Sequence, residues 1–164
     1  MKKLVRPMVP EDWEQVAAIY TEGINTGNAT FETVVPPWDE WNANHLPFAR
    51  LAADDGGVVG WAALSPVSRR SVYSGVAEVS VYVSSESRGR GIGKQLLLKL
   101  IAESEANGIW TLQASIFPEN AASIRLHLKC GFREVGTRQA IARRDGVWRN
   151  TVLLERRSKI VGVD

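Results

Sequence analysis

A glycine-rich string at positions 88–93, Arg-Gly-Arg-Gly-Ile-Gly, is the first candidate for a binding site in this 164-residue chain. Its glycines let the backbone pass close to a ligand, and the helical pattern that follows aims free N–H groups and a partial positive charge at the same point. Arg88, Arg90 and Lys94 add cations, so the string predicts a phosphate or pyrophosphate site. A tight turn between a strand and a helix would need the same glycines, and this alternative stays open.

Two other phosphate motifs fail at single positions. A dinucleotide fingerprint would need glycine at position 94, where Lys94 stands, and a P-loop would need Ser or Thr at position 95, where Gln95 stands. The string therefore predicts neither a nucleotide-binding βαβ unit nor an NTPase.

Glu78 lies inside the apolar segment AEVSVYV at positions 77–83. In a strand, alternation places Glu78, Ser80 and Tyr82 on one face and the apolar residues on the other. A carboxylate in so apolar a strand is costly unless it is paired or used, which makes Glu78 a candidate functional group. An ion-paired or solvent-facing glutamate is the ordinary alternative.

Three polar residues of the expected helix 119–129 share one face, since Asn120, Ser123 and His127 are separated by three and four positions. Such a face can follow an extended ligand. The ordinary alternatives are a helix N-cap for Asn120 and a packed, neutral ring for His127.

The remaining pattern predicts how these residues are positioned. Helices are expected at 11–23, 91–106 and 119–129, and residues 25–37 as a loop or broken helix; strands are expected at 3–6, 50–53, 58–64, 77–83, 109–116, 132–138 and 147–155. Hairpins exclude an all-parallel sheet, so we expect an α/β (α+β) fold with a mixed, mainly antiparallel sheet and helices on both faces. We expect one domain over residues 1–164, with residues 158–164 frayed.

Composition narrows the possible functions. The chain has 20 Lys and Arg against 18 Asp and Glu, a formal charge of +2 that does not suggest nucleic-acid binding. Its single cysteine, Cys130, forms no internal disulfide, and no metal-ligand spacing occurs, so no metal is expected. Without a signal peptide or a membrane span, a soluble cytoplasmic protein is expected.

Read as Arg88-x-x-Gly91-x-Gly93, the string resembles the coenzyme A pyrophosphate loop of the GNAT acetyltransferase superfamily. A second match follows, from Asn120 through His127 to Gly131-Phe132. Thr-Phe-Glu at 30–32, Tyr73 and Val-Trp-Arg at 147–149 resemble the phosphinothricin and methionine-sulfoximine N-acetyltransferase branch, over roughly residues 3–156. The resemblance implies a homodimeric cytoplasmic enzyme that acetylates a primary amine from acetyl-coenzyme A.

The resemblance also implies roles for individual residues. Glu78 would be the general base that removes a proton from the amine, and His127 the acid that protonates the leaving thiolate. A backbone N–H near Tyr82 or Val83 would stabilise the oxyanion. Cofactor contacts are expected at Val81, Tyr82, Val83, Arg88, Gly89, Arg90, Gly91, Ile92, Gly93, Lys94, Asn120 and Ser123. Substrate contacts are expected at Phe31, Glu32, Arg69, Arg70 and Tyr73.

The chain departs from this branch in two places. Val67 and Ser68 follow the Ser-Pro pair at 65–66, where an aromatic and a basic residue are usual, and Asn150 stands where an acidic residue is common. An acceptor other than an amino-acid analogue therefore stays open. The alternatives are an N-acetyltransferase for protein amines or polyamines, and a noncatalytic coenzyme A-binding module.

Overall fold

The computed structural model describes residues 4–164, and its strands form one seven-stranded sheet of order β1-β2-β3-β4-β5-β7-β6. Neighbouring strands are antiparallel except β4 and β5, which are parallel. The predicted mixed, mainly antiparallel sheet is confirmed. The strands are β1 (Val5–Pro7), β2 (Leu51–Asp54), β3 (Val58–Pro66), β4 (Val76–Val83), β5 (Thr111–Ile116), β6 (Arg133–Arg144) and β7 (Val147–Arg157).

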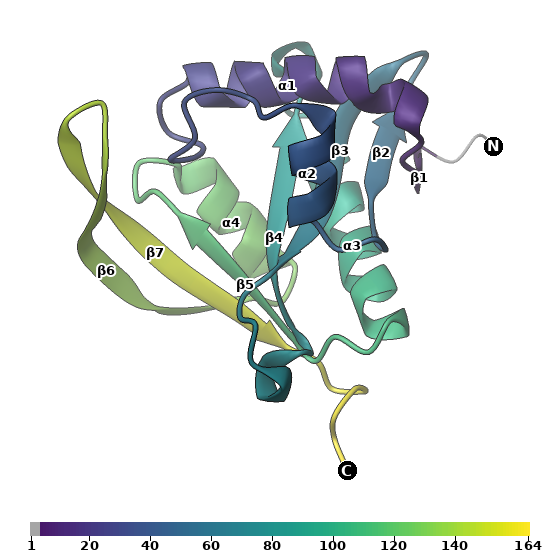
Figure 1. Ribbon diagram of the computed structural model, residues 1–164, viewed down its shortest axis with the longest axis vertical. Coiled ribbons are helices and arrows are strands. Elements are labelled where there is room, and N and C mark those ends of the chain that lie inside the picture. The colour runs from purple at the N-terminus through teal and green to yellow at the C-terminus, as the bar shows by residue number, and fades with distance from the viewer. Residues whose placement is uncertain (1–3) are drawn as a thin grey trace.

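Helices cover both faces of the sheet, as predicted. On one face lie α1 (Trp13–Asn25) and α2 (Trp38–Asn44), and on the other α3 (Ile92–Ala106) and α4 (Ala121–Lys129) (Figure 1). Short 3-10 turns stand at Pro10–Asp12, Ser71–Tyr73 and Ser85–Ser87. No helix within residues 4–164 is long and apolar enough to cross a membrane.

The sheet separates two apolar cores. Beneath α3, the core contains Leu96, Leu97 and Leu100 together with buried residues of β4, β5 and β7. Beneath α1 and α2, it is mainly aromatic and centres on Trp41 and Trp61. Ala77, Val79, Val81 and Val83 of β4 join the first core and Tyr82 the second, so the predicted alternation along this strand is confirmed.

The two parallel strands part after three residue pairs. Val76–Glu78 of β4 pairs with Thr111–Gln113 of β5, and beyond that point neither strand has a pairing partner on the other. Both continue, to Val83 and to Ile116. The sheet therefore opens in its middle, beside the glycine turn that begins α3.

Some boundaries differ from the prediction. The opening strand is Val5–Pro7, and Lys3 lies outside the described residues. Helix α2 was not predicted, because its seven residues are too few to show a helical period. β6 runs to Arg144 instead of residue 138, because a bulge breaks its alternation.

Residues 158–164 are expected to fray, but several hydrogen bonds hold this tail in the structure. The Arg157 guanidinium donates to the carbonyl oxygens of Ser158, Val161 and Gly162, at 2.9, 2.8 and 2.6 Å. The tail therefore has defined contacts as far as Gly162.

Candidate active site

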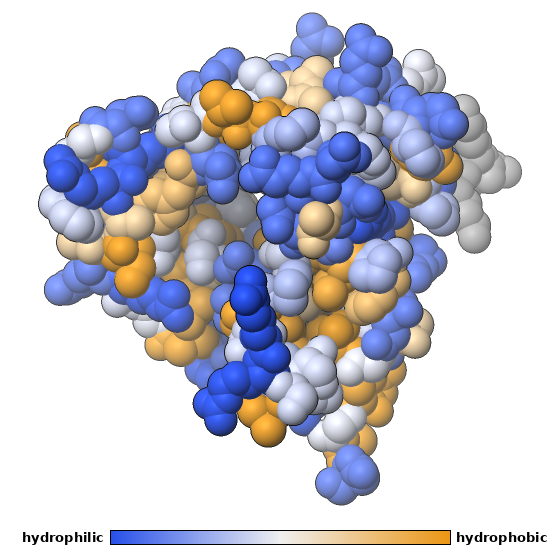
Figure 2. Space-filling view, in the orientation of Figure 1, coloured by the Kyte–Doolittle hydropathy of each residue, from blue (hydrophilic) through white to orange (hydrophobic). Residues whose placement is uncertain are grey.

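A cleft of about 850 Å³ occupies the opening between β4 and β5. Figure 2 shows a recess on this side of the molecule, between the β6–β7 hairpin and the segment that carries α2. The cleft collects fifteen of the residues singled out above: Phe31, Glu32, Glu78, Val81, Tyr82, Val83, Arg88, Gly89, Gly91, Ile92, Gly93, Lys94, Asn120, Ser123 and His127. Arg90, Arg69, Arg70 and Tyr73 do not line it.

Two glycines of the turn show why the string is built as it is. Gly91 has φ +76° at the N-cap of α3, and a Cβ there would meet no atom within 4 Å, so the backbone is open to a ligand. A Cβ on Gly93 would meet Leu126 Cδ2 at 3.2 Å, so this glycine lets α3 pack closely on α4. The free N–H groups of the first turn of α3 face the same open space.

Four cations line the cleft around this turn, namely Arg88, Lys94, Arg125 and Lys129, and we call this region the cationic half. Within residues 4–164, none of the four forms an ion pair. Arg90, in contrast, pairs with Asp55 at 2.7 Å outside the cleft. Arg125 and Lys129 were not predicted, although their spacing of four on a helix indicates a shared face.

The β4 edge offers backbone donors to the cleft. Ser84 donates its N–H to Val59 of β3 at 2.8 Å, and backbone groups alternate sides along a strand. With the observed β3–β4 register, the Tyr82 N–H therefore points to β3, whereas those of Val81 and Val83 point to the open side. Of the two positions expected to supply an oxyanion donor, only Val83 has this orientation.

Glu78 lies at the base of the opening. Its Oε1 accepts a hydrogen bond from Gln113 Nε2 of β5 at 3.3 Å, and its side chain is half-buried. Within residues 4–164 no cation pairs with it. A carboxylate held by a neutral amide keeps lone pairs free to accept a proton, which fits the predicted base.

Asn120 caps α4, as its ordinary alternative supposed. Its Oδ1 accepts from the Ser123 N–H, and its Nδ2 donates to the Asn28 carbonyl oxygen, both at 3.3 Å. Asn120 therefore joins α4 to the segment after α1, while still lining the cleft.

His127 is buried, with its Nδ1 2.7 Å from the Ser123 carbonyl oxygen. Because a carbonyl oxygen only accepts, Nδ1 carries the proton, and in the neutral ring Nε2 carries none. Burial lowers the pKa of His127, so the neutral ring dominates near pH 7. In this state the ring has no Nε2 proton to give, so the predicted acid role requires that it be protonated first.

Residues 26–32, which we call the acceptor wall, form the side of the cleft opposite the cationic half. Phe31 packs edge-on against Phe117 at 4.8 Å between ring centroids. Burial raises the pKa of Tyr82 and of Tyr20; the neighbouring Tyr20 adds to this effect at Tyr82, and the negative charge of Glu32 adds to it at Tyr20. The acceptor wall, the base of β4 and the β5–α4 turn make up an acidic half of the cleft, which carries Glu32, Glu78 and Glu119. Within residues 4–164, no cation lines this half.

The segment with Arg69, Arg70 and Tyr73 lies outside the cleft and is exposed. The Arg70 guanidinium stacks over the Tyr73 ring at 5.6 Å. Contact between these residues and a substrate stays a prediction.

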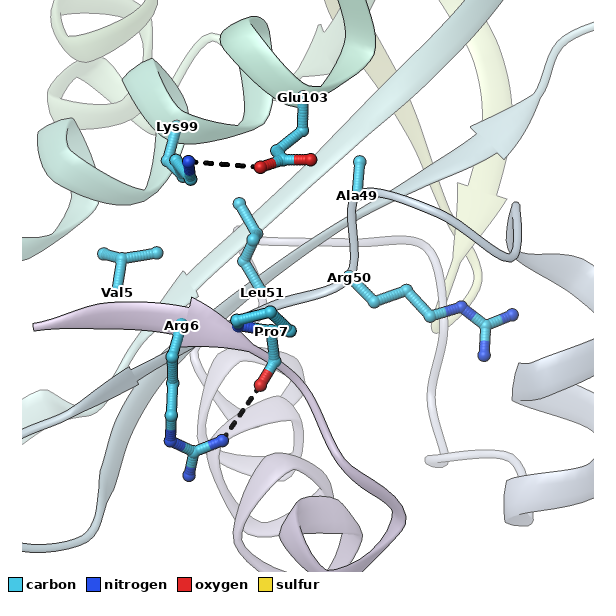
Figure 3. A pocket seen from close by; sticks show the side chains of 8 residues that line it. All are labelled: Val5, Arg6, Pro7, Ala49, Arg50, Leu51, Lys99 and Glu103. Carbon is cyan, nitrogen blue, oxygen red and sulfur yellow. Dashed lines mark hydrogen bonds and ion pairs between the residues drawn. The ribbon is translucent and has the colours of Figure 1, made fainter. Parts of the chain in front are cut away.

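A second, smaller pocket of about 240 Å³ lies between β1, β2 and α3 (Figure 3). Its cations are occupied: Arg6 pairs with Asp12 and Asp54, and Lys99 with Glu103. Arg50 donates to carbonyl oxygens of residues 42, 45 and 46. Each charged side chain that lines this pocket therefore already has a partner within residues 4–164. Elsewhere in residues 4–164, no group of three or more His, Cys, Asp or Glu residues is placed to hold a metal ion.

Comparison with known protein families shows which family of proteins has this fold and cleft. The model of the GNAT acetyltransferase family matches residues 13–132. The chain belongs to the GNAT acetyltransferase family. For this GNAT enzyme, the matched region runs from the start of α1 through the glycine turn and α4 to Phe132.

Two relatives of this GNAT enzyme share most of its length. A phosphinothricin N-acetyltransferase of Alcaligenes faecalis is 35% identical over 160 residues, or 93% of this chain and 81% of the relative. An L-methionine sulfoximine/L-methionine sulfone acetyltransferase of Pseudomonas aeruginosa is 30% identical over 94% of each chain. The predicted similarity to this branch of the family is confirmed.

Two solved structures resemble the GNAT fold seen here. A Brucella melitensis ribosomal-protein-alanine N-acetyltransferase has a TM-score of 0.89 and 33% identity, covering 95% of this chain and 100% of its own. A Sinorhizobium meliloti phosphinothricin acetyltransferase in complex with AcCoA has a TM-score of 0.88 and 31% identity, covering 100% and 92%. The predicted GNAT fold is confirmed.

Proposed function

We propose that this enzyme transfers an acetyl group from acetyl-coenzyme A to the primary amine of a small, amino-acid-like molecule, with Glu78 as general base. One observation carries the proposal. A single cleft combines a cation-lined glycine turn, an open strand edge with two backbone donors, and a carboxylate that pairs with no cation of residues 4–164.

The cationic half fits a coenzyme A phosphate group. A pyrophosphate and a 3′-phosphate together carry about four negative charges, which the four unpaired cations of this half would balance. The pantetheine arm would follow the open edge of β4, where the Val81 and Val83 N–H groups are free to donate. The acetyl thioester would supply the acyl group, and the Val83 N–H would donate to its carbonyl oxygen.

Glu78 would prepare the amine. An α-amino group has a pKa of about 7.7–8.0, so most of it is protonated at neutral pH and cannot attack a carbonyl. A carboxylate at the base of the cleft can take one proton, directly or through a water, while Gln113 holds it in place. His127 presents an Nε2 acceptor at neutral pH and would hold a hydrogen-bond donor more readily than it would give a proton.

The nature of the acceptor rests on two observations that favour different compounds. The relatives from Alcaligenes faecalis and Pseudomonas aeruginosa are named for amino-acid analogues, which supports such an acceptor here. The acidic half, however, has carboxylates and no lining cation to hold an acceptor's own carboxylate. That arrangement favours an amine without a carboxylate, such as a polyamine or a protein amine, as the second candidate.

A panel of amines separates these candidates. Free-thiol release from acetyl-coenzyme A would be followed with methionine sulfoximine, its decarboxylated amine, spermidine and a peptide with amino-terminal alanine. Arg69 and Arg70 lie outside the cleft in the ligand-free enzyme, so the amino-acid assignment requires that one of them turn toward the bound carboxylate. On that assignment we expect methionine sulfoximine to be a better substrate than its decarboxylated amine, by about 10-fold or more in kcat/KM. Equal rates with methionine sulfoximine and its decarboxylated amine, or a preference for spermidine or the peptide, would reject the amino-acid assignment.

A homodimer is also proposed. The β6–β7 hairpin exposes Val135, Ile141, Val147 and Trp148, apolar side chains that a second copy of the chain would cover. Light scattering should give twice the monomer mass for the wild type and a lower mass for Trp148→Glu. A monomeric wild type would reject the dimer.

A further inference from the structure

The β6–β7 hairpin is bent by a bulge that Asn150 holds. Arg138 pairs with Thr151 and Ala142 with Arg149, so residues 139–141 of β6 stand opposite Asn150 alone. Ala140 has φ +46° and donates its N–H to Asn150 Oδ1 at 2.8 Å. Such an insertion bends a strand pair and increases its twist.

The bend brings the end of the hairpin to the carboxyl end of α1 (Figure 1). There Arg144 Nη2 donates to the Ile24 carbonyl oxygen, in the last turn of α1, at 2.7 Å. A cation at this end of a helix stabilises its unpaired carbonyl groups. The hairpin therefore fixes the point from which the acceptor wall, residues 26–32, departs.

Arg149 of β7 makes four further contacts, two of them with this wall. Its Nη1 donates to the Gly27 carbonyl oxygen and its Nη2 to Asn28 Oδ1, both at 2.9 Å. Nη2 also lies 3.3 Å from the Glu119 carboxylate, and the guanidinium stacks 4.0 Å from the centroid of the Phe117 ring. The side chain is only 15% exposed, and it does not line the cleft itself.

These contacts join two segments that form one side of the cleft. Gly27 and Asn28 belong to the stretch between α1 and α2, whereas Phe117 and Glu119 lie between β5 and α4, some 90 positions later. The guanidinium supplies several donors in a fixed plane, so one side chain sets the spacing of both segments. Phe31 packs edge-on against the same Phe117 ring, so its position depends on the same arrangement.

We propose that Arg149 is a positioning residue for acetyl transfer, which holds the acceptor wall against the β5–α4 turn and so determines acceptor binding. The proposal rests on the proposed function. Within residues 4–164, Arg149 makes no hydrogen bond, ion pair or ring contact with a residue of the cationic half. Its link to α4 is indirect, through Asn28, whose carbonyl oxygen accepts from Asn120. Its loss should therefore weaken acceptor binding and leave cofactor binding nearly unchanged.

The test compares two methionine variants of the same hairpin. Arg149→Met keeps an apolar contact with Phe117 and removes the donors. Arg143→Met is the matched control, because Arg143 also stacks on an aromatic ring, Trp148 at 5.4 Å, and donates to the Gly146 carbonyl oxygen, both within the hairpin. We expect Arg149→Met to raise the acceptor KM about 10-fold or more, with the acetyl-coenzyme A Kd within about twofold of wild type. Arg143→Met should change neither.

A second readout needs no enzyme activity. Hydrogen exchange of the ligand-free protein, followed by mass spectrometry, should show faster exchange over residues 26–32 in Arg149→Met and wild-type exchange in Arg143→Met. If no amine is acetylated by the wild type, the proposed function fails, and this exchange measurement still decides the positioning role.

Two milder variants apply if Arg149→Met does not fold. Arg149→Lys keeps a positive charge near Glu119 but loses the pair of hydrogen bonds to Gly27 and Asn28. Asn28→Ala removes the Oδ1 atom that accepts one of these hydrogen bonds and leaves Arg149 in place. Both should raise the acceptor KM, by less than Arg149→Met would. Equal increases in acceptor KM and cofactor Kd, or unchanged exchange over residues 26–32, would overturn the proposal.

Discussion

The two halves of the cleft are built in different ways. The cationic half comes from local sequence: one turn at 88–94, followed by its helix, and one face of α4. The acidic half is assembled from the acceptor wall, the base of β4 and the β5–α4 turn, held together by an arginine from β7. Phosphate binding needs only backbone donors and charge near a helix terminus, whereas orienting a small acceptor needs side chains from distant segments.

The largest expected effect comes from Glu78, where the halves meet. Glu78→Gln should lower kcat by roughly 10²–10⁴-fold, because the amine would lose its base, with partial recovery at high pH where free amine is abundant. Steady-state kinetics from neutral to alkaline pH would measure this. Glu103→Gln is the control, since Glu103 pairs with Lys99 away from the cleft. A Glu78→Gln enzyme with the wild-type rate at neutral pH would remove Glu78 from the mechanism.

Gly91 tests the cationic half. Gly91→Asp places a side chain and a negative charge where the backbone should meet the phosphates, and we expect the acetyl-coenzyme A Kd to rise about 100-fold. Gly56→Asp is the matched control, because Gly56 has φ +77° and similar open space in the β2–β3 turn. Both variants should lose similar stability, and calorimetry should find weaker binding only in the first. Unchanged binding in Gly91→Asp would sink the cofactor assignment.

The arginines of the turn allow a finer comparison. Arg88→Gln should raise the KM for acetyl-coenzyme A about 10-fold, whereas Arg90→Gln should change it less than about threefold, because Arg90 is engaged by Asp55. The glycine-rich motif alone predicts that both Arg88 and Arg90 contact the cofactor. Equal effects in initial-rate measurements would show that Arg90 leaves Asp55 to bind the cofactor.

The smallest expected effect is on stability. Burial lowers the pKa of both histidines, His45 after α2, whose ring stacks on Trp41, and His127 in the cationic half. Below the ordinary value of 6.5 the unfolded chain therefore binds more protons than the folded one, and stability falls as the pH drops through this window.

Urea unfolding of the ligand-free protein between about pH 5 and pH 7 would measure this loss, well above the range in which Asp12 titrates. His45→Gln and His127→Gln should each reduce the slope, and each variant gives the contribution of one histidine. A wild-type stability that stays flat or rises on acidification contradicts the expected direction.

The sequence predicted the locally encoded parts of the structure better than the contacts between distant segments. The sheet, its hairpins, the glycine turn and α4 depend on local periodicity and turn residues, and these predictions are confirmed. The contacts of Arg149 with Gly27 and Asn28 span more than 120 positions, and no local period records them. The Asn150 bulge also escaped prediction, because it interrupts the alternation from which strands are recognised.

Individual roles were less predictable than placement. The spacing of Asn120 and His127 predicted a shared face correctly, and the two side chains make the bonds of their ordinary alternatives: Asn120 caps α4, and the buried His127 ring donates to the Ser123 carbonyl oxygen. Arg90 was expected at the phosphates because it lies in the motif, but its side chain points to Asp55. A motif determines where the backbone passes, while the direction of a long side chain depends on the charges that the fold places beside it.

The separation of the two halves is the central claim, and one set of binding measurements tests it. The acetyl-coenzyme A Kd and the acceptor KM would be determined for Gly91→Asp, Arg149→Met and the double variant. We expect the first variant to change only the cofactor constant, the second only the acceptor constant, and the double variant to show both changes added as free energies. If each single variant raises both constants, the cleft behaves as one unit and the account is wrong.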